Sequence, residues 1–157
     1  MSWSTTVSAI ATMLGTVTGI TGGAGKVIAY KPLNERPDAW RTALKGAAKI
    51  NAWTITRQAA SIRQTGTGRR WVPGHDEAVV EGWYAATGDG SVSEPAFQAL
   101  VDAVLAAFAS STTIWVRGLE SEPITVRAVP INLEAIGGDL CHHVEIRFPV
   151  QDAATVT

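Results

Sequence analysis

The most regular hydrophobic pattern in this chain lies in SVSEPAFQALVDAVLAAFASS, residues 91–111. Its large apolar residues recur at intervals of three and four, which is the period of an α-helix with one buried stripe. Ser91 or Ser93 is a suitable N-cap, and Ser91 with Glu94 has the spacing of a capping box. We therefore expect a long amphipathic helix that anchors the core, with an apolar stripe of Phe97, Leu100, Val101, Val104, Leu105 and Phe108.

The same spacing recurs near the N-terminus, in residues 4–18, where Ser4 is available as the N-cap. A shorter helix is expected over residues 37–45, because proline suits the first turn at Pro37 and glycine suits the exit at Gly46. The apolar stripe of the first helix consists of Val7, Ile10, Ala11, Leu14 and Val17.

Period-two alternation and β-branched or aromatic residues indicate strands elsewhere in the chain. Because consecutive strands are mostly close enough for hairpins, the order of elements predicts an α+β fold. In that fold a mainly antiparallel, mixed β-sheet carries the N-terminal helix and the long amphipathic helix on one face. The expected strands are VIAY (27–30), AKINAWTITRQ (48–58), AVVEGWYAAT (78–87), TTIWVRG (112–118), PITVRAVPINLEA (123–135) and GDLCHHVEIRFPV (138–150).

The last of these strands contains the single cysteine and two of the three histidines. Alternation places His142 on the apolar face, as a partly buried residue with one hydrogen-bond partner, and places Cys141, His143, Glu145 and Arg147 on the other. A zinc site needs three or four protein ligands, and the chain has no second cysteine and only one further histidine. We therefore assign no metal, no cofactor and no nucleophile to this strand, and leave open whether its second face is exposed or covered by a neighbouring subunit.

A polar, glycine-containing stretch, RQTGTGRRWVPGHDE, separates two of the expected strands. We expect one domain, residues 1–157, in which a flexible loop or hairpin tip spans about residues 62–77. His75, Asp76 and Glu77 are interpreted as solvated rather than as acid–base groups, because catalysis needs such groups held by packed neighbours.

The segment GITGGAGKV invites comparison with a phosphate-binding loop. Gly19 and Gly25 are separated by five residues instead of four, and Val27 follows Lys26 where a serine or threonine is required. A turn between helix and strand is the better interpretation.

Composition suits a single soluble globular domain, since the chain has 157 residues, 46% hydrophobic and 17% charged, with a net charge of −1. This total suggests no nucleic-acid or membrane partner, and an uncharged N-terminal stretch lacks the basic start of a signal peptide. Residues 26–70 hold ten Lys or Arg against two acids, a net of +8, whereas residues 71–157 hold three against twelve, a net of −9. The two halves either cancel within the fold or provide one basic and one acidic side for head-to-tail contact between copies.

Tryptophan and arginine are favoured anchors of protein interfaces, and six tryptophans are many for this length. A protein contact is therefore preferred to nucleic-acid binding for the basic, aromatic cluster around Trp71. The interface candidates are Arg63, Arg69, Arg70, Trp71, Trp53, Trp83, His143, Glu145 and Arg147.

Three segments taken in order, KINAWTITRQ, VVEGWYAATGDGSVSEPAFQALVDAVLAAF and GGDLCHHVEIRFPV, resemble tail terminator proteins of long-tailed bacteriophages and phage-like particles. The resemblance covers about residues 49–150 and includes no catalytic signature. It implies a small α+β domain that forms a ring, commonly of six copies.

Such a ring caps the tail tube at the head-proximal end of the virion, ends tail elongation and offers a surface to the head. The resemblance therefore implies a structural virion protein assembled in the host cytoplasm, without enzymatic activity or cofactor. The implied partners are other copies of the chain, the tail tube protein and a head–tail connector or head-completion protein, with DNA at most passing through the channel and no membrane.

Three alternatives stay open: a neck or head-completion connector, a small enzyme using His75 or His142, and a nucleic-acid-binding module at residues 63–71.

Overall fold

The computed structural model describes residues 3–30, 37–46, 49–65, 70–111, 127–128, 131–136 and 138–151. Within these ranges the helices are α1 (Trp3–Thr16), α2 (Pro37–Leu44) and α3 (Ser93–Ser110), with a short 3₁₀ turn, η1 (Thr21–Gly23). The strands are β1 (Lys26–Ile28), β2 (Asn51–Thr65), β3 (Arg70–Ala85), β4 (Arg127–Ala128), β5 (Asn132–Ile136) and β6 (Asp139–Gln151).

These strands form one six-stranded sheet in the order β1-β2-β3-β6, and both β4 and β5 pair with the outer side of β6. Only β1 and β2 are parallel, and the other pairs are antiparallel. The expected α+β class, with a mixed but mainly antiparallel sheet, is confirmed.

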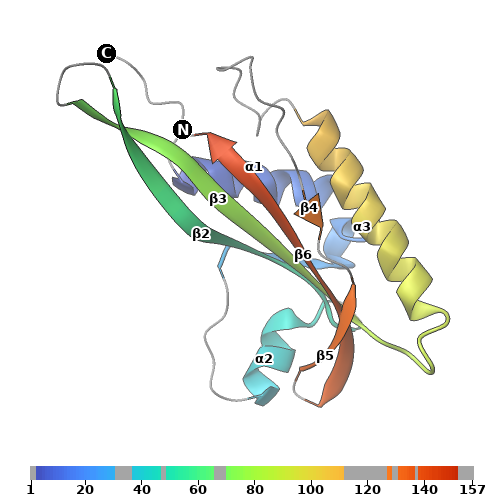
Figure 1. The fold of residues 1–157 in the computed structure, drawn as a ribbon. Helices are drawn as coiled ribbons and strands as arrows, with labels where there is room; N and C mark the ends of the chain where they lie inside the picture. The colour runs from blue at the N-terminus through green and yellow to red at the C-terminus, as the bar shows by residue number, and fades with distance from the viewer. Residues whose placement is uncertain are drawn as a thin grey trace.

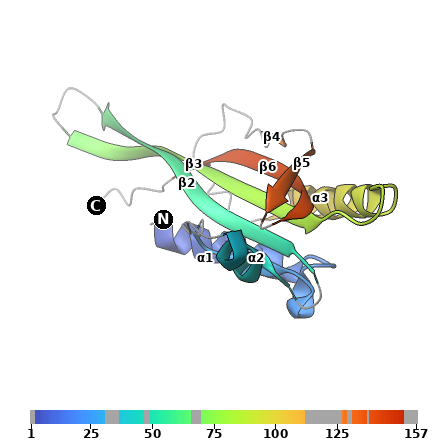
Figure 2. The same cartoon turned by 90° about the horizontal axis from the view of Figure 1, so that it is seen from below.

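The main core lies between one face of this sheet and the two longer helices (Figures 1 and 2). Helix α3 runs beside the sheet and buries the stripe that its spacing predicts, with only Leu105 partly exposed. Phe108 of this stripe packs against Phe148 of β6, with ring centroids 4.6 Å apart. The N-terminal helix α1 contributes its own stripe, in which Ile10 and Leu14 are fully buried.

Gly82 makes the centre of this core possible because it leaves room for the indole ring of Trp53. The two residues are direct partners in the β2–β3 register. A Cβ atom at Gly82 would lie 2.8 Å from Cη2 and Cζ3 of Trp53 and 3.0 Å from Cγ1 of Val144. The indole therefore lies flat across β3 and reaches toward β6 and α3, where Phe97 is 6.1 Å away between ring centroids.

The opposite face of the sheet is also covered at one end. A second, smaller cluster there joins α2 to residues of β1, β2, β3, β5 and β6, because alternation turns the neighbours of the main-core residues toward this face. Arg41 of α2 also forms an ion pair with Asp139, with Nε and Oδ2 2.7 Å apart. The members of the cluster are Ile28, Leu44, Ile50, Ala52, Trp83, Ile136 and Cys141.

The start of α3 differs from the expected capping box. The N-cap residue is Val92, which has no side-chain cap, and Ser91 does not cap the helix. Ser93 instead points inward, where its Oγ accepts a hydrogen bond from the Thr87 N–H at 3.0 Å and lies 2.9 Å from Nε2 of His142. A hydroxyl engaged with a buried ring is not available to the helix terminus, so the capping prediction was wrong.

His142 is confirmed as a histidine on the core face with a hydrogen-bond partner, and at 2% exposure it is more deeply buried than expected. Its hydrogen bond ties the first turn of α3 to β6.

The first helix begins at Trp3, so Ser4 lies inside it and is not the N-cap. The glycine-rich segment that follows is a turn between helix and strand, as the spacing of its glycines indicates. Asn51, at the start of β2, donates from Nδ2 to the carbonyl oxygens of Gly19 and Ala24, at 2.9 and 3.2 Å. The carbonyl groups of this turn are therefore fixed to the sheet by one buried side chain.

The two central strands extend well beyond their expected ends. Of the segment expected as a loop or hairpin tip, residues 62–65 belong to β2 and residues 70–77 to β3, and residues 66–69 lie outside the described part of the chain. The turn residues suggested a loop or a hairpin tip here, and the two strands pair as a hairpin through the described residues, with register shifts between Arg57 and Ala59 and between Ala60 and Ile62.

The expected strand at residues 112–118 lies outside the described residues, and the expected strand at residues 123–135 is described only where it contains β4 and most of β5.

Replacing Gly82 with alanine forces a methyl group into the Trp53 ring, so we expect Gly82→Ala to lower the free energy of unfolding by about 1–3 kcal/mol. The matched control is Gly15→Ala in α1, where nothing lies within 4 Å of the added Cβ. That change should raise stability by about 0.5–1 kcal/mol, because alanine suits a helix better than glycine. Urea denaturation of both variants measures the difference, and equal stabilities would contradict the described packing.

Candidate interaction surface

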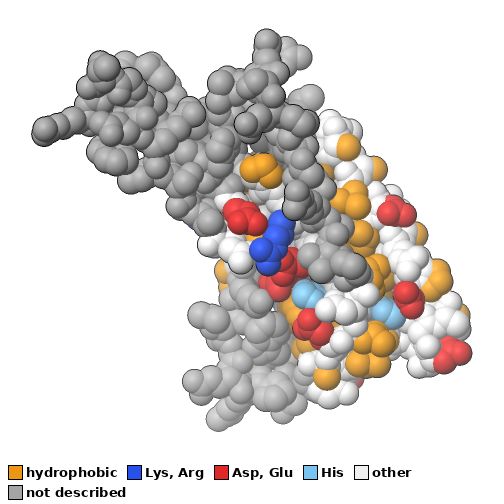
Figure 3. Space-filling model, viewed as in Figure 1, with side chains coloured by type: hydrophobic (Ala, Val, Ile, Leu, Met, Phe, Trp, Pro, Cys, Tyr) orange, Lys and Arg blue, Asp and Glu red, His pale blue; other side chains and the backbone are white. Residues whose placement is uncertain are grey.

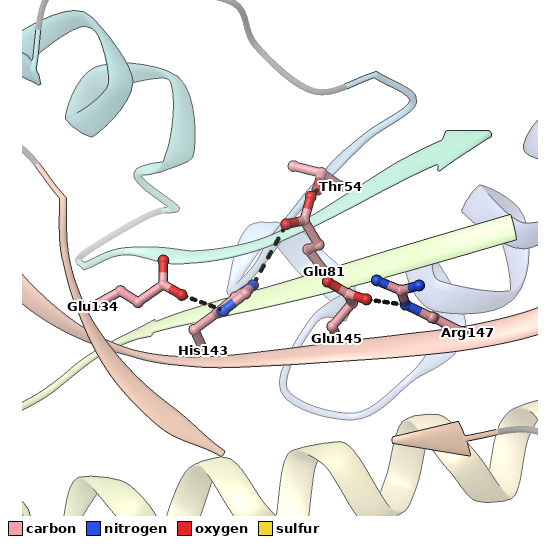
Figure 4. Close-up of polar contacts among 6 residues, drawn as sticks. All are labelled: Thr54, Glu81, Glu134, His143, Glu145 and Arg147. Carbon is pink, nitrogen blue, oxygen red and sulfur yellow. Dashed lines mark hydrogen bonds and ion pairs between the residues drawn. The ribbon is translucent and has the colours of Figure 1, made fainter. Parts of the chain in front are cut away.

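A row of charged side chains crosses the sheet on the face opposite α1 and α3. It consists of Glu77, Glu81, Glu134, His143, Glu145 and Arg147, and we call it the charged row. These residues come from β3, β5 and β6, and most are drawn in Figure 4. Figure 3 shows acidic, basic and histidine side chains gathered on this face.

His143 lies at the centre of the row and is 8% exposed. Its ring stacks on the directly opposite Trp83, with centroids 3.8 Å apart and planes 20° apart. Nδ1 is 3.0 Å from Oε1 of Glu134, and Nε2 is 3.5 Å from Oε1 of Glu81. The imidazole therefore has a carboxylate on either side of its ring.

Glu81 and Glu145 are direct partners across β3 and β6, an arrangement of like charges that is unfavourable on its own. Glu81 is 5% exposed, and its Oε2 lies 3.5 Å from Oγ1 of Thr54. Glu145 accepts a hydrogen bond from Nε of Arg147. The two carboxylates therefore point to different partners, Glu81 toward the imidazole of His143 and Glu145 toward the guanidinium of Arg147 (Figure 4).

Arg147 joins two carboxylates of the row. Besides the hydrogen bond to Glu145, its Nη1 lies 3.8 Å from Oε1 of Glu77. The hydrogen bond to Glu145, followed by the charges of the neighbouring carboxylates, raises the pKa of Arg147 above its usual value. The guanidinium is therefore a permanent positive charge in the row.

Acidic groups exceed basic groups in this row. Four carboxylates face Arg147 and His143, and Arg127 of β4 pairs with Arg147 in the sheet register. Counted over the described residues with Arg127 included, the excess is two negative charges with neutral His143 and one with the cation. The surface is therefore complementary to a basic partner.

Cys141 lies next to the row but has no reactive character. It is fully buried, and its Sγ lies 3.8 Å from the carbonyl oxygen of Asp139. Burial, and to a lesser degree the charge of Asp139, raises the pKa of the Cys141 thiol to about 11. At neutral pH the side chain is a neutral thiol that fills the second cluster, so it lacks the thiolate that a nucleophile needs.

Trp53 and Trp83 were wrong as interface candidates, because the sheet buries both indole rings. Trp53 is 0% exposed in the main core, and Trp83 is 5% exposed in the second cluster. By contrast His143, Glu145 and Arg147 do lie together on one face, as the alternation of the last strand predicts.

The basic candidates lie at the other end of the sheet. Arg63 is in β2, while Arg70 and Trp71 are in β3, where the register pairs Arg63 with Val72 and Trp71 with Gln64. Arg69 lies outside the described residues. These residues are therefore separate from the charged row and belong to the far part of the β2–β3 hairpin.

Two acidic members of the row, Glu81 and Glu134, were not singled out by the sequence, and Glu77 was interpreted only as a solvated residue although it contacts Arg147. Alternation within β3 does place Glu77 and Glu81 on one face. The sequence does not give the register that brings them against β6, and Glu134 reaches His143 only because β5 folds back on β6.

The far part of the β2–β3 hairpin extends beyond the rest of the sheet (Figures 1 and 2). β6 pairs with β3 only as far as His75, and β1 pairs with β2 only at residues 52–54. Residues 60–65 and 70–75, which we call the arm, are thus a two-stranded ribbon over most of their length among the described residues. An isolated pair of strands is at best marginally stable in water, so contact with a further surface would stabilise the arm.

Comparison with protein-family models and with curated proteins found no match. Over the described residues, no helix has the length and apolar character needed to cross a membrane. The same residues contain no group of three or more metal-ligating side chains placed to hold an ion.

The raised pKa of Cys141 has a direct consequence for alkylation. At pH 8.5 about 0.3% of a thiol with a pKa near 11 is ionised, against about half of an ordinary cysteine. We expect the iodoacetamide reaction of the native protein to be slow and to keep accelerating up to about pH 11. The chain unfolded in urea is the control, with a plateau above pH 9, and the same plateau in the native protein would contradict the burial of the thiol.

Proposed function

We propose that this chain is a structural subunit that assembles head to tail into a ring, as a tail terminator of a long-tailed phage or phage-like particle does. In that role the ring, of six copies by resemblance, caps the tail tube at the head-proximal end of the virion. It ends tail elongation and offers a joining surface to the head. The confirmed α+β fold agrees with the fold that the resemblance implies.

The arm is the observation that carries the proposal. It projects from a body whose own strands end before it, and its outer β2 edge has no partner among the described residues beyond Thr54. Exposed strand edges invite pairing with another chain unless they are covered. An element that is supported only at its base is suited to contact a neighbouring subunit.

Charge supports a contact between different surfaces rather than a symmetric one. The arm and its connecting residues carry Arg63, Arg69 and Arg70 and no acid, whereas the charged row has an acidic excess. A contact between two different patches repeats from copy to copy and closes into a ring when the rotation allows.

The proposal predicts rings with a central channel in negative-stain images of the purified protein. It further predicts that the rings bind the ends of tail tubes and stop their growth in a polymerisation assay. Binding to DNA-filled heads without binding to tubes would instead indicate a neck connector. A compact monomer at every concentration would contradict assembly altogether.

The control variant removes the arm without changing the body. Replacing residues 61–75 with an Asn-Gly turn joins Ala60 to Asp76, which are partners in the register. Circular dichroism should report an intact fold, while the rings should be lost.

A further inference from the structure

We infer that the charged row is the docking surface for the arm of the neighbouring copy. This inference rests on the proposed ring and specifies its contact: basic residues of one subunit lie against Glu77, Glu134 and Glu145 of the next. The arm supplies Arg63 and Arg70, with Arg69 in its connecting residues.

Among the described residues, the row contains more acidic than basic side chains. Arg147 is shared between Glu77 and Glu145, and Glu134 contacts His143 with its side chain 43% exposed. Partial removal of a carboxylate from water raises the free energy of the folded protein unless a cation or hydrogen-bond donor faces the carboxylate. Guanidinium groups supply both, with a fork of N–H donors that matches a carboxylate.

The buried imidazole of His143 also has a nitrogen at this surface that is unpartnered among the described residues. His143 is more than nine-tenths buried, and its Nε2 makes no hydrogen bond within the described part of the chain. The Oε1 atom of Glu81 lies 3.5 Å from Nε2, as an ion-pair contact. Among the described residues, this buried imidazole therefore has one nitrogen without a hydrogen-bond partner.

Geometry also favours a contact between copies. The arm contains six residues of β2, about 20 Å at roughly 3.3 Å per residue, which is long enough to cover the roughly 13 Å of the row on β3 from Glu77 to Glu81. Because β3 is one continuous strand from the row into the arm, an arm leads away from its own row (Figure 1). Each copy therefore offers an arm to one neighbour and a row to another, which is a head-to-tail contact.

Charge reversal tests the inference in three variants, by sedimentation in about 50 mM salt, where surface charges are weakly screened. The arm variant carries Arg63→Glu and Arg70→Glu, and the row variant carries Glu77→Lys and Glu134→Lys. Each alone should weaken assembly at least tenfold in dissociation constant. The combined variant restores opposite charges in the contact and should assemble within about threefold of the natural chain.

The matched control is Glu94→Lys with Asp102→Lys on α3, because both residues are exposed and the change in total charge equals that of the row variant. It should assemble like the natural chain. If a lysine variant fails to fold by circular dichroism, Glu77→Gln with Glu134→Gln replaces it, and the same weakening is expected.

Two outcomes overturn the inference while leaving the ring intact: arm and row variants that assemble as the control does, or a combined variant that is weaker than both. If the natural chain stays monomeric at every concentration, the proposed function fails and the inference fails with it.

Discussion

The structure depends on one strand that is longer than the body that covers it. β3 pairs with β2 along nearly its whole length and with β6 over its second part, and the residues between alternate between two covered faces. In the covered part, Gly82 accommodates Trp53 on the helix side, and Trp83 stacks on His143 on the other side. Beyond His75 the same strand pairs only with β2 among the residues that the structure describes. One hairpin therefore has two parts, a base that is packed on both faces and an arm that projects beyond it.

Packing on both faces of the sheet fixes the orientation of the side chains in the charged row. Trp83 and Cys141 close the row at one end with apolar contacts, and Arg147 holds its carboxylates at the other. His143 is in the middle, within reach of carboxylates on both sides. A partner that docks here meets groups already oriented by packing, which lowers the entropy lost on binding.

Periodicity in the sequence was sufficient to predict the helices, the α+β class and the two faces of the last strand, because these depend on local alternation and on burial. Pairing register and loop closure are not local, so Glu81 and Glu134 were missed as neighbours of His143. Glycine and charge in residues 62–77 favoured a loop or hairpin tip, and pairing between β2 and β3 extends both strands into this segment. Trp53 and Trp83 were expected at an interface because tryptophan is common there, but the glycine opposite Trp53 creates a buried place for its ring.

We propose that another copy, rather than its own chain, holds the arm. Hydrogen exchange of the arm amides, residues 60–65 and 70–75, tests it when dilute monomer is compared with assembled protein. We expect rapid exchange in the monomer and at least tenfold slower exchange after assembly, while the amides of Val79 to Trp83 are protected in both states. Arm amides that exchange equally in monomer and assembly would contradict the account.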